Sequence, residues 1–376
     1  MDILILNKNY PSRVNTVTTD KPYLNQLQLD KIYQQSEGSP DITIAIIDGA
    51  VDGKHADFEQ ANITQLKADN QQPEAVCYNQ SSPSCQHGTF VTGVLAAHRK
   101  SSSPGIAPGC KYLIRPIFCE KNNLQDCPTL KEKELARAVN ESIDAGANII
   151  NMSVGSTVQR NAISAELKTA YNRAQQNNVL LVGASGNQAS QQVNSLFQHP
   201  WVIAVAAMDK EGEIEPSANT GTWVNQYGLL ASGSQVTSAS AGGGHRTMTG
   251  TSVATPFVTG TAALLWSLEP TASALQIRNA LLQNLPGKEP SKADKFATAP
   301  RALDAQMSLT QLKRFHLASN PSFSEASTAT LTRSETLNSQ SLNSENPQDE
   351  PVMELAVNQQ PTLDKAIEAE VKGISS

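Results

Sequence analysis

The sequence predicts a three-layer α/β fold in which a mostly parallel central sheet is covered by helices on both faces. Short, nearly continuous apolar runs such as 42–47 and 179–182 are typical of strands buried on both faces of a parallel sheet. Amphipathic segments separate these runs, and strands that alternate with helices indicate a parallel sheet. Because ligands bind outside the carboxyl ends of the strands in such sheets, a functional site is expected there.

The predicted elements follow this alternation along the chain. A short helix near 24–35 precedes a break at 36–40, and the first strand at 42–47 ends at Asp48. A polar loop is expected at 59–86, where few apolar positions recur. The later predicted strands lie at 112–118, 148–152, 179–182 and 201–206, with short strands between 214 and 236, and the helices lie at 87–97, 130–145, 162–176, around Ser252 to Trp266, and at 274–282.

Composition divides the chain into three parts. Residues 1–23 form a polar N-terminal extension, and residues 24–312 hold the predicted folded domain. In residues 313–376 Ser, Thr, Asn, Gln, Glu and Pro dominate, so this segment cannot bury enough apolar surface to offset the entropy of ordering. A disordered tail is expected. A short terminal helix is the alternative, since Leu363, Ile367 and Val371 are spaced by four.

Charge and hydropathy exclude several kinds of partner. The formal net charge is -6 and no long Lys/Arg run occurs, which argues against nucleic-acid binding. The apolar stretch at the N-terminus, residues 3–6, is too short for a signal peptide, and no apolar run approaches the roughly 20 residues of a membrane span. A cytoplasmic monomer is expected, and non-classical secretion is left open.

Five cysteines occur, at positions 77, 85, 110, 119 and 127. An odd number without a C-x-x-C pair disfavours zinc, so free thiols are the first expectation. Cys77 with Cys85, and Cys119 with Cys127, each bracket a short polar loop and are candidate pairs in an oxidising setting. The sequence alone leaves their disulfide state open.

Ser252 lies at the start of a helix that is apolar on most of its faces and is therefore buried. The backbone N–H groups at a helix start have no partner within the helix, and the dipole favours negative charge. Such a position suits a hydroxyl that passes through an oxyanion. For the serine alone, an ordinary N-cap is the simpler interpretation.

Three further residues favour a catalytic role for Ser252 over an ordinary N-cap. Asp48 ends the first buried strand, where a carboxylate can orient an imidazole, and His87 opens a helix beside Gly88. Asn187 closes a glycine-rich turn after the strand at 179–182, where its amide can donate to an oxyanion. Each residue alone fits a turn or a cap, but the order Asp…His…Ser is that of the subtilisin arrangement. We expect Asp48 to orient His87, and His87 to take the proton of Ser252.

These blocks resemble the subtilisin-like serine proteases, peptidase family S8, from about residue 24 to 285. The resemblance rests on Ile46-Ile47-Asp48-Gly49, His87-Gly88-Thr89-Phe90-Val91 and Gly250-Thr251-Ser252-Val253-Ala254-Thr255-Pro256. It implies that the substrate backbone pairs with one edge and that a second segment walls the pocket for the residue before the cut. These substrate-binding segments are Ser153, Val154 and Gly155, and then Gly183, Ala184, Ser185 and Gly186.

A narrower likeness concerns the proteases that mature cyanobactin-type ribosomal peptides. It rests on the phrases at 48–52, 105–108 and 176–182. No cofactor is expected. Asp52, Asp57 and Glu59 are candidate calcium ligands, but a charged, solvated loop is the preferred interpretation.

The predicted function is that of a serine endopeptidase acting through an acyl-enzyme on Ser252, with a peptide or protein as substrate. Three uses of this site are possible: processing of a ribosomal precursor peptide, broad protein degradation, and peptide binding by an inactive protease. An α/β-hydrolase is disfavoured, because it requires the order Ser…Asp/Glu…His.

Overall fold

The computed structural model describes residues 22–66, 77–121, 131–155, 162–283 and 300–318. Seven strands form a single sheet in the order β2-β3-β1-β4-β5-β6-β7, and every neighbouring pair is parallel. The predicted α/β class with a mostly parallel sheet is therefore confirmed. The strands are β1 (Thr43–Asp48), β2 (Asn62–Gln65), β3 (Lys111–Pro116), β4 (Ile149–Met152), β5 (Leu180–Ala184), β6 (Val202–Met208) and β7 (Gly228–Ser232).

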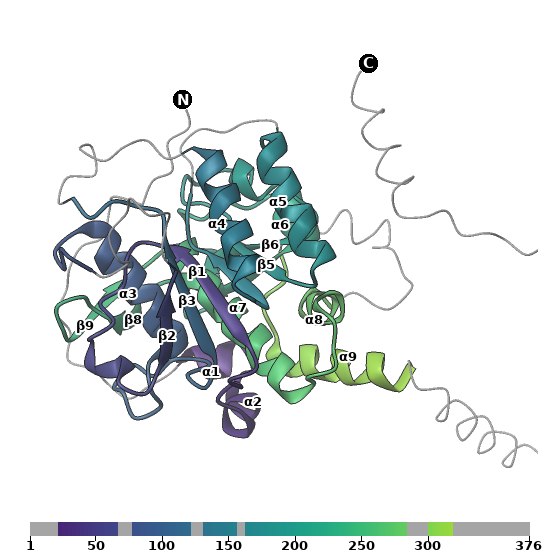
Figure 1. Ribbon diagram of the computed structural model, residues 1–376. Helices are drawn as coiled ribbons and strands as arrows, with labels where there is room; N and C mark the ends of the chain where they lie inside the picture. Colours follow the sequence, from purple (N-terminus) through teal and green to yellow (C-terminus); the bar gives the residue numbers. More distant parts are fainter. Residues whose placement is uncertain (1–21, 67–76, 122–130, 156–161, 284–299, 319–376) are drawn as a thin grey trace, which may run out of the picture. The chain divides into compact units, whose positions relative to one another are not determined.

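Helices lie on both faces of this sheet (Figure 1). The helices α3 (Pro83–Ala96) and α7 (Thr251–Leu268) pack against each other, and α7 contacts β4 to β7. The helices α4 (Glu132–Asp144) and α5 (Ala165–Gln176) form a second packed pair that reaches β1, β3 and β5. A separate antiparallel hairpin, β8 (Val236–Ala239) and β9 (His245–Met248), packs on α3 through β8.

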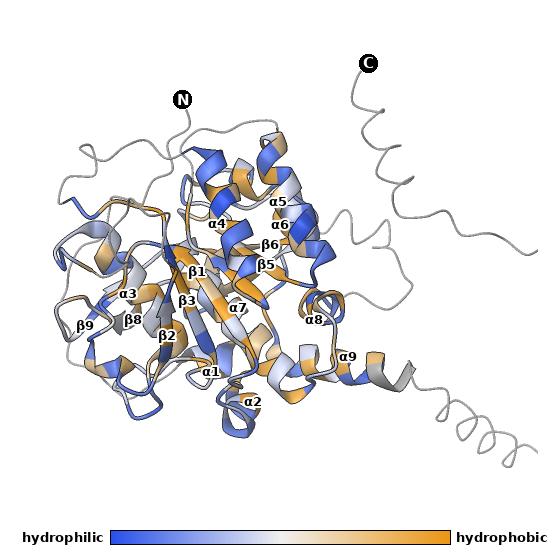
Figure 2. Cartoon of the chain, viewed as in Figure 1, coloured by the Kyte–Doolittle hydropathy of each residue, from blue (hydrophilic) through white to orange (hydrophobic). Residues whose placement is uncertain are grey.

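The core consists of the strands and α7. Every residue of β5 and β6 is buried, as expected for strands covered on both faces, and Figure 2 shows the hydrophobic colouring concentrated there. Residues 251–266 of α7 are all buried, which confirms the prediction that the Ser252 helix lies in the interior. Among the described residues, no helix is long and apolar enough to cross a bilayer.

Several elements differ from their predicted positions. The single helix expected at 24–35 is two short helices, α1 (Pro22–Gln26) and α2 (Asp30–Gln35), because the backbone at Gln28 turns to a φ of 52°. The polar loop expected at 59–86 contains β2, and α3 begins at Pro83 rather than His87. The structure also adds α6 (Thr222–Tyr227) and α9 (Ala305–Ala318) to the predicted elements, and α8 (Ala274–Leu281) lies where predicted.

The boundaries predicted for the domains remain predictions. The helix α9 crosses the boundary placed at residue 312, and its Leu312 is buried in the core. The extension at 1–21 and the tail beyond Ala318, including its predicted terminal helix, lie outside the described residues.

Candidate active site

Asp48 is the last residue of β1 and is fully buried. Its Oδ1 accepts hydrogen bonds from the backbone N–H of Gly49 at 2.6 Å and from Nδ1 of His87 at 2.7 Å. Because an ionised carboxylate only accepts, this bond places the imidazole proton on Nδ1. The neutral ring of His87 then presents Nε2 as an acceptor on its other side.

Two glycines allow β1 and α3 to approach closely enough for this bond. A Cβ on Gly49 would lie 1.9 Å from the carbonyl oxygen of Ser84, and a Cβ on Gly88 would lie 2.5 Å from the carbonyl oxygens of Gly49 and Ala50. Both contacts are far shorter than real Cβ atoms show. The sequence pairs Asp-Gly and His-Gly are therefore what brings the carboxylate and the imidazole together.

Ser252 is the second residue of α7, and its Oγ lies 3.0 Å from Nε2 of His87. Gly250, the residue that caps α7, has a φ of 155°, a backbone conformation that favours glycine. The neutral imidazole accepts at Nε2, so the hydroxyl of Ser252 donates. Carboxylate, imidazole and hydroxyl thus form one hydrogen-bonded chain, which is the arrangement that turns a serine into a nucleophile.

The backbone carbonyl of Ser252 has an unusual partner. In an α-helix this carbonyl would accept from the N–H four residues later, but that residue is Pro256, which has none. The Oγ of Ser153 donates to it instead, at 3.0 Å. Ser153 Oγ in turn accepts from Nδ2 of Asn151 at 2.9 Å, and Oδ1 of Asn151 accepts from Thr259 at 2.9 Å.

All the side chains of this relay are buried, so each polar atom in it must find its partner within the protein. Sequence reasoning missed the relay, although a proline four residues after the serine signals a carbonyl in need of another donor. Ser153 was predicted to form a substrate edge through its backbone. That role stays a prediction, and the side chain is committed to α7.

Asn187 is held against the start of α7. Its Oδ1 accepts the backbone N–H of Thr251 at 2.8 Å, and Oγ1 of Thr251 accepts the N–H of Gly186 at 3.1 Å. Since only the amide oxygen can accept from Thr251, Nδ2 of Asn187 is left on the opposite side of the amide. It makes no hydrogen bond to the described residues, and a donor without a partner beside Ser252 is what an oxyanion requires.

The predicted substrate segments lie where β4 and β5 end. In the sheet β4 pairs with β1, and β5 pairs with β4. All three strands are parallel, so the carboxyl ends of β4 and β5 lie at the same edge as Asp48. Gly183 lies inside β5, and a Cβ there would be 2.7 Å from the buried ring of Phe197. The segments are Ser153, Val154 and Gly155 after β4, and Gly183, Ala184, Ser185 and Gly186 at the end of β5.

Asp52 and Asp57 are not the solvated loop residues that the sequence predicted. Both are buried, because the β8–β9 hairpin reaches over them. Oδ2 of Asp52 accepts from Gln80 and from the backbone N–H of Gly242, and Oδ2 of Asp57 accepts from Nε2 of His245 at 2.9 Å. Burial alone would raise the pKa of Asp57, but hydrogen bonds from His245 and Ser101 hold this pKa below its usual value. Glu59, the third candidate calcium ligand, is exposed.

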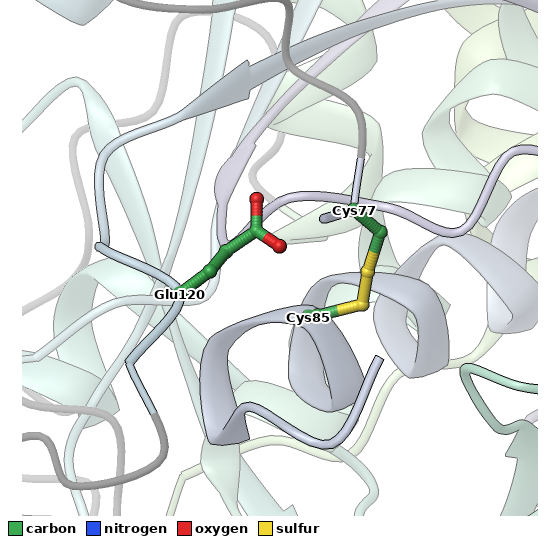
Figure 3. Close-up of side chains that lie close together, drawn as sticks. All are labelled: Cys77, Cys85 and Glu120. Carbon is green, nitrogen blue, oxygen red and sulfur yellow. A yellow bond between two sulfur atoms is a disulfide. The ribbon is translucent and has the colours of Figure 1, made fainter. Parts of the chain in front are cut away.

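Cys77 and Cys85 form a disulfide, so the first expectation of free thiols is wrong for this pair. Figure 3 shows the disulfide with the carboxylate of Glu120 beside it, the one grouping of metal-ligand type among the described residues. Sulfurs joined in a disulfide are not thiolates and hold no metal in this state. One carboxylate oxygen of Glu120 accepts the N–H of Asn79 at 2.9 Å.

Of the two other cysteines in the described residues, one is disulfide-bonded and one is free. Cys119 is also disulfide-bonded, and its predicted partner Cys127 lies outside the described residues. Cys110 is a free, buried thiol, and burial raises its pKa to about 11.

Comparison with solved structures finds close matches over almost their entire length. A solved chain of the patellamide maturation protease PatA is 35% identical with a TM-score of 0.61, over 73% of this chain and 98% of the solved chain. A solved chain of the prenylagaramide maturation protease PagA is 31% identical with a TM-score of 0.64, over 76% of this chain and 98% of the solved chain.

A thermostable alkaline protease of Halalkalibacterium halodurans is 35% identical over 199 residues, which are 52% of this chain and 51% of that protein. The chain thus spans about half the length of this relative. Residues 39–314 match the subtilase family, peptidase S8. This match covers well over half of the sequence and contains Asp48, His87, Asn187 and Ser252, and the chain therefore belongs to the subtilase family.

Proposed function

We propose that the chain is a subtilisin-like serine endopeptidase that hydrolyses peptide bonds through an acyl-enzyme on Ser252. The observation that carries this proposal is the continuous hydrogen-bonded path from Asp48 through His87 to Ser252, with distances of 2.7 Å and 3.0 Å. These distances are within the reach that a base and a nucleophile need before substrate binds.

In the proposed reaction, Oγ of Ser252 attacks the carbonyl carbon while Nε2 of His87 takes the hydroxyl proton. Asp48 stabilises the resulting imidazolium and keeps the ring in place. The carbonyl oxygen becomes an oxyanion, which Nδ2 of Asn187 and the backbone N–H of Ser252 stabilise. The imidazolium then gives its proton to the leaving amine, and the amine departs. A water molecule, deprotonated by His87, hydrolyses the acyl-enzyme and restores the serine.

The proposed substrate is an extended peptide, bound along Ser153–Gly155 and along 183–186. Main-chain hydrogen bonds to such segments give affinity for many sequences, and side-chain pockets give selectivity. We further propose that the physiological substrate is a ribosomal precursor peptide, because solved chains of proteins named as maturation proteases match this chain over nearly all of their solved length. Action as a cytoplasmic monomer is part of the same proposal.

Broad degradation is the second candidate, favoured by the likeness to an alkaline protease. A peptide-binding protein without activity is the third, and the intact hydrogen-bonded path opposes it.

Two experiments test the proposal. A fluorophosphonate probe should label the wild-type chain at Ser252, as mapped by mass spectrometry, and Ser252→Ala should abolish both labelling and peptidase activity. Retained cleavage by Ser252→Ala would refute the acyl-enzyme. A panel of unrelated denatured proteins should remain largely uncut, whereas general digestion of that panel would favour the degradative role.

A further inference from the structure

Asn219 lies in the connection between β6 and α6 and is completely buried. Within the described part of the chain, its side chain makes three hydrogen bonds, all to the loop that follows β5. Oδ1 accepts the backbone N–H groups of Gln188 at 2.9 Å and Ser190 at 3.1 Å, and Nδ2 donates to Oε1 of Gln188 at 2.8 Å. A buried side chain whose bonds all end on one loop serves to hold that loop in one conformation.

The backbone of Asn219 holds the same loop on the other side of Asn187. The N–H of Asn219 donates to the carbonyl of Gly186 at 2.8 Å, and its carbonyl accepts from Oγ of Ser185 at 2.7 Å. Asn187 is therefore bracketed, with Gly186 before it and Gln188 after it both bonded to Asn219.

The local backbone is adapted to this contact. Gly186 has a φ of 112°, and a Cβ at Gly186 would lie 2.3 Å from Nδ2 of Asn219. Only glycine allows both the backbone conformation and the close approach. Thr251 fixes the amide orientation of Asn187, as described above, so α7 and Asn219 hold Asn187 from two directions.

We propose that Asn219 is a positioning residue that fixes the loop carrying Asn187, so that Nδ2 of Asn187 meets the oxyanion formed at Ser252. This inference rests on the proposed function. Donors stabilise an oxyanion because they are already in place before the charge develops. If the loop that carries Asn187 shifts, the reaction at Ser252 should slow even though the amide donor is still present. Asn219 itself makes no contact with the substrate in this scheme.

A double-mutant cycle tests the proposal with a fluorophosphonate probe, whose phosphoryl oxygen is meant to occupy the oxyanion position. The readout is the rate of Ser252 labelling, separated into reversible affinity (KI) and maximal rate (kinact). Loss of one oxyanion donor in Asn187→Ala typically costs about 10²–10³ in rate. Asn219→Ala should lower kinact by about 10-fold or more and leave KI nearly unchanged, and Asn187→Ala/Asn219→Ala should be no slower than Asn187→Ala alone, since coupled residues are not additive.

The matched control is Asn148→Ala. Oδ1 of Asn148 accepts the backbone N–H of Thr43 at 2.8 Å, at the opposite end of the sheet from Ser252. This variant should lose stability in urea and keep the labelling rate. If Asn219→Ala does not fold, Asn219→Ser, which can still accept one bond, replaces it in the cycle.

The outcomes separate the two proposals. Multiplicative rate losses in the double variant, or an Asn219→Ala variant that labels at the wild-type rate, would overturn the positioning role while the acyl-enzyme stands. Absence of an effect in Asn187→Ala would instead remove the oxyanion role of Asn187 itself, and unlabelled wild-type protein would refute the proposed function.

Discussion

The hydroxyl of Ser153 donates a hydrogen bond of 3.0 Å to the backbone carbonyl of Ser252. This bond replaces the helical partner that a proline four residues further along α7 cannot supply. The position of Ser252 in α7 is therefore tied to the residue that follows β4.

Ser153→Ala should destabilise the protein by about 1–3 kcal/mol, since it leaves a buried carbonyl and a buried amide N–H without partners. Urea unfolding measures the loss, and labelling of Ser252 should slow in the folded variant. Ser142→Ala is the control, because the equally buried Ser142 donates to Ala138, a carbonyl inside α4 that keeps its helical partner. Equal stability losses in the two variants would show that Ser153 has no special role.

Gly88→Ala should separate Asp48 from His87. The added Cβ meets two backbone carbonyl oxygens at 2.5 Å, and backbone atoms cannot turn aside as a flexible side chain can. Activity should fall by at least about 10²-fold, because a displacement near 1 Å costs that much at a positioned catalytic group. Gly53→Ala is the control, since a Cβ there lies 3.8 Å from the end of Gln65. A Gly88→Ala variant with wild-type turnover would contradict this account of the close approach.

His199 should make stability depend on pH. Burial, with the charges of Lys168 and Arg278, lowers its pKa from 6.5 to about 4 in the folded state. Between these values the unfolded chain binds a proton that the folded chain does not, so stability falls as the pH drops from 6.5 towards 4. The loss is on the order of 3 to 4 kcal/mol, for a shift from 6.5 to about 4 at 1.36 kcal/mol per pKa unit.

His199→Gln removes this titration. Its free energy of unfolding in urea should change less between pH 7 and pH 4.5 than that of the wild type. Parallel pH profiles in the two proteins would show that the imidazole of His199 does not contribute.

The Cys77–Cys85 disulfide should stabilise the segment that leads into α3. Its cysteines are separated by 8 residues in the sequence, and the chain-entropy relation gives about 2–3 kcal/mol for a loop of that length. Cys77→Ser/Cys85→Ser should lose this amount in urea unfolding. Reductant should then lower the stability of the wild type more than that of the double variant. An equal response to reductant in both proteins would place the sensitive bond elsewhere.

The sequence predicted best those elements whose position is determined by the burial of apolar side chains alone. The run that ends at Asp48 is apolar except for Thr43, and such a run fits a strand buried on both faces, as β1 is after its first residue. Edge elements were harder to predict. In β2 only Ile63 is apolar, and it is partly buried against the core. The other residues of β2 are polar, so its sequence lacks the alternation of apolar and polar residues that predicts a strand. The prediction placed the start of α3 at His87 and overlooked a signal further upstream, where Ser82 caps the helix and Pro83 lies in its first turn.

In the candidate site, too, some residues could be predicted from the sequence and others could not. Asp48, His87 and Ser252 could be found from their order and their glycine neighbours, and the structure brings these side chains within hydrogen-bonding distance. Asn219 carries no sequence signal, because a lone asparagine in a loop looks the same whether its amide is solvated or buried. Its partners are set by how two loops meet, which no local pattern contains.

The three hydrogen-bonded side chains lie far apart in the sequence, so the ribosome makes them at different times. His87 and Ser252 are 165 positions apart, and β4, β5, β6 and β7 are all made between them. A ribosome that has completed only the first half of the chain has produced the carboxylate and the imidazole without the hydroxyl. If Ser252 is the nucleophile, as proposed, a nascent chain cannot cleave its neighbours until α7 has been made and has packed against the sheet.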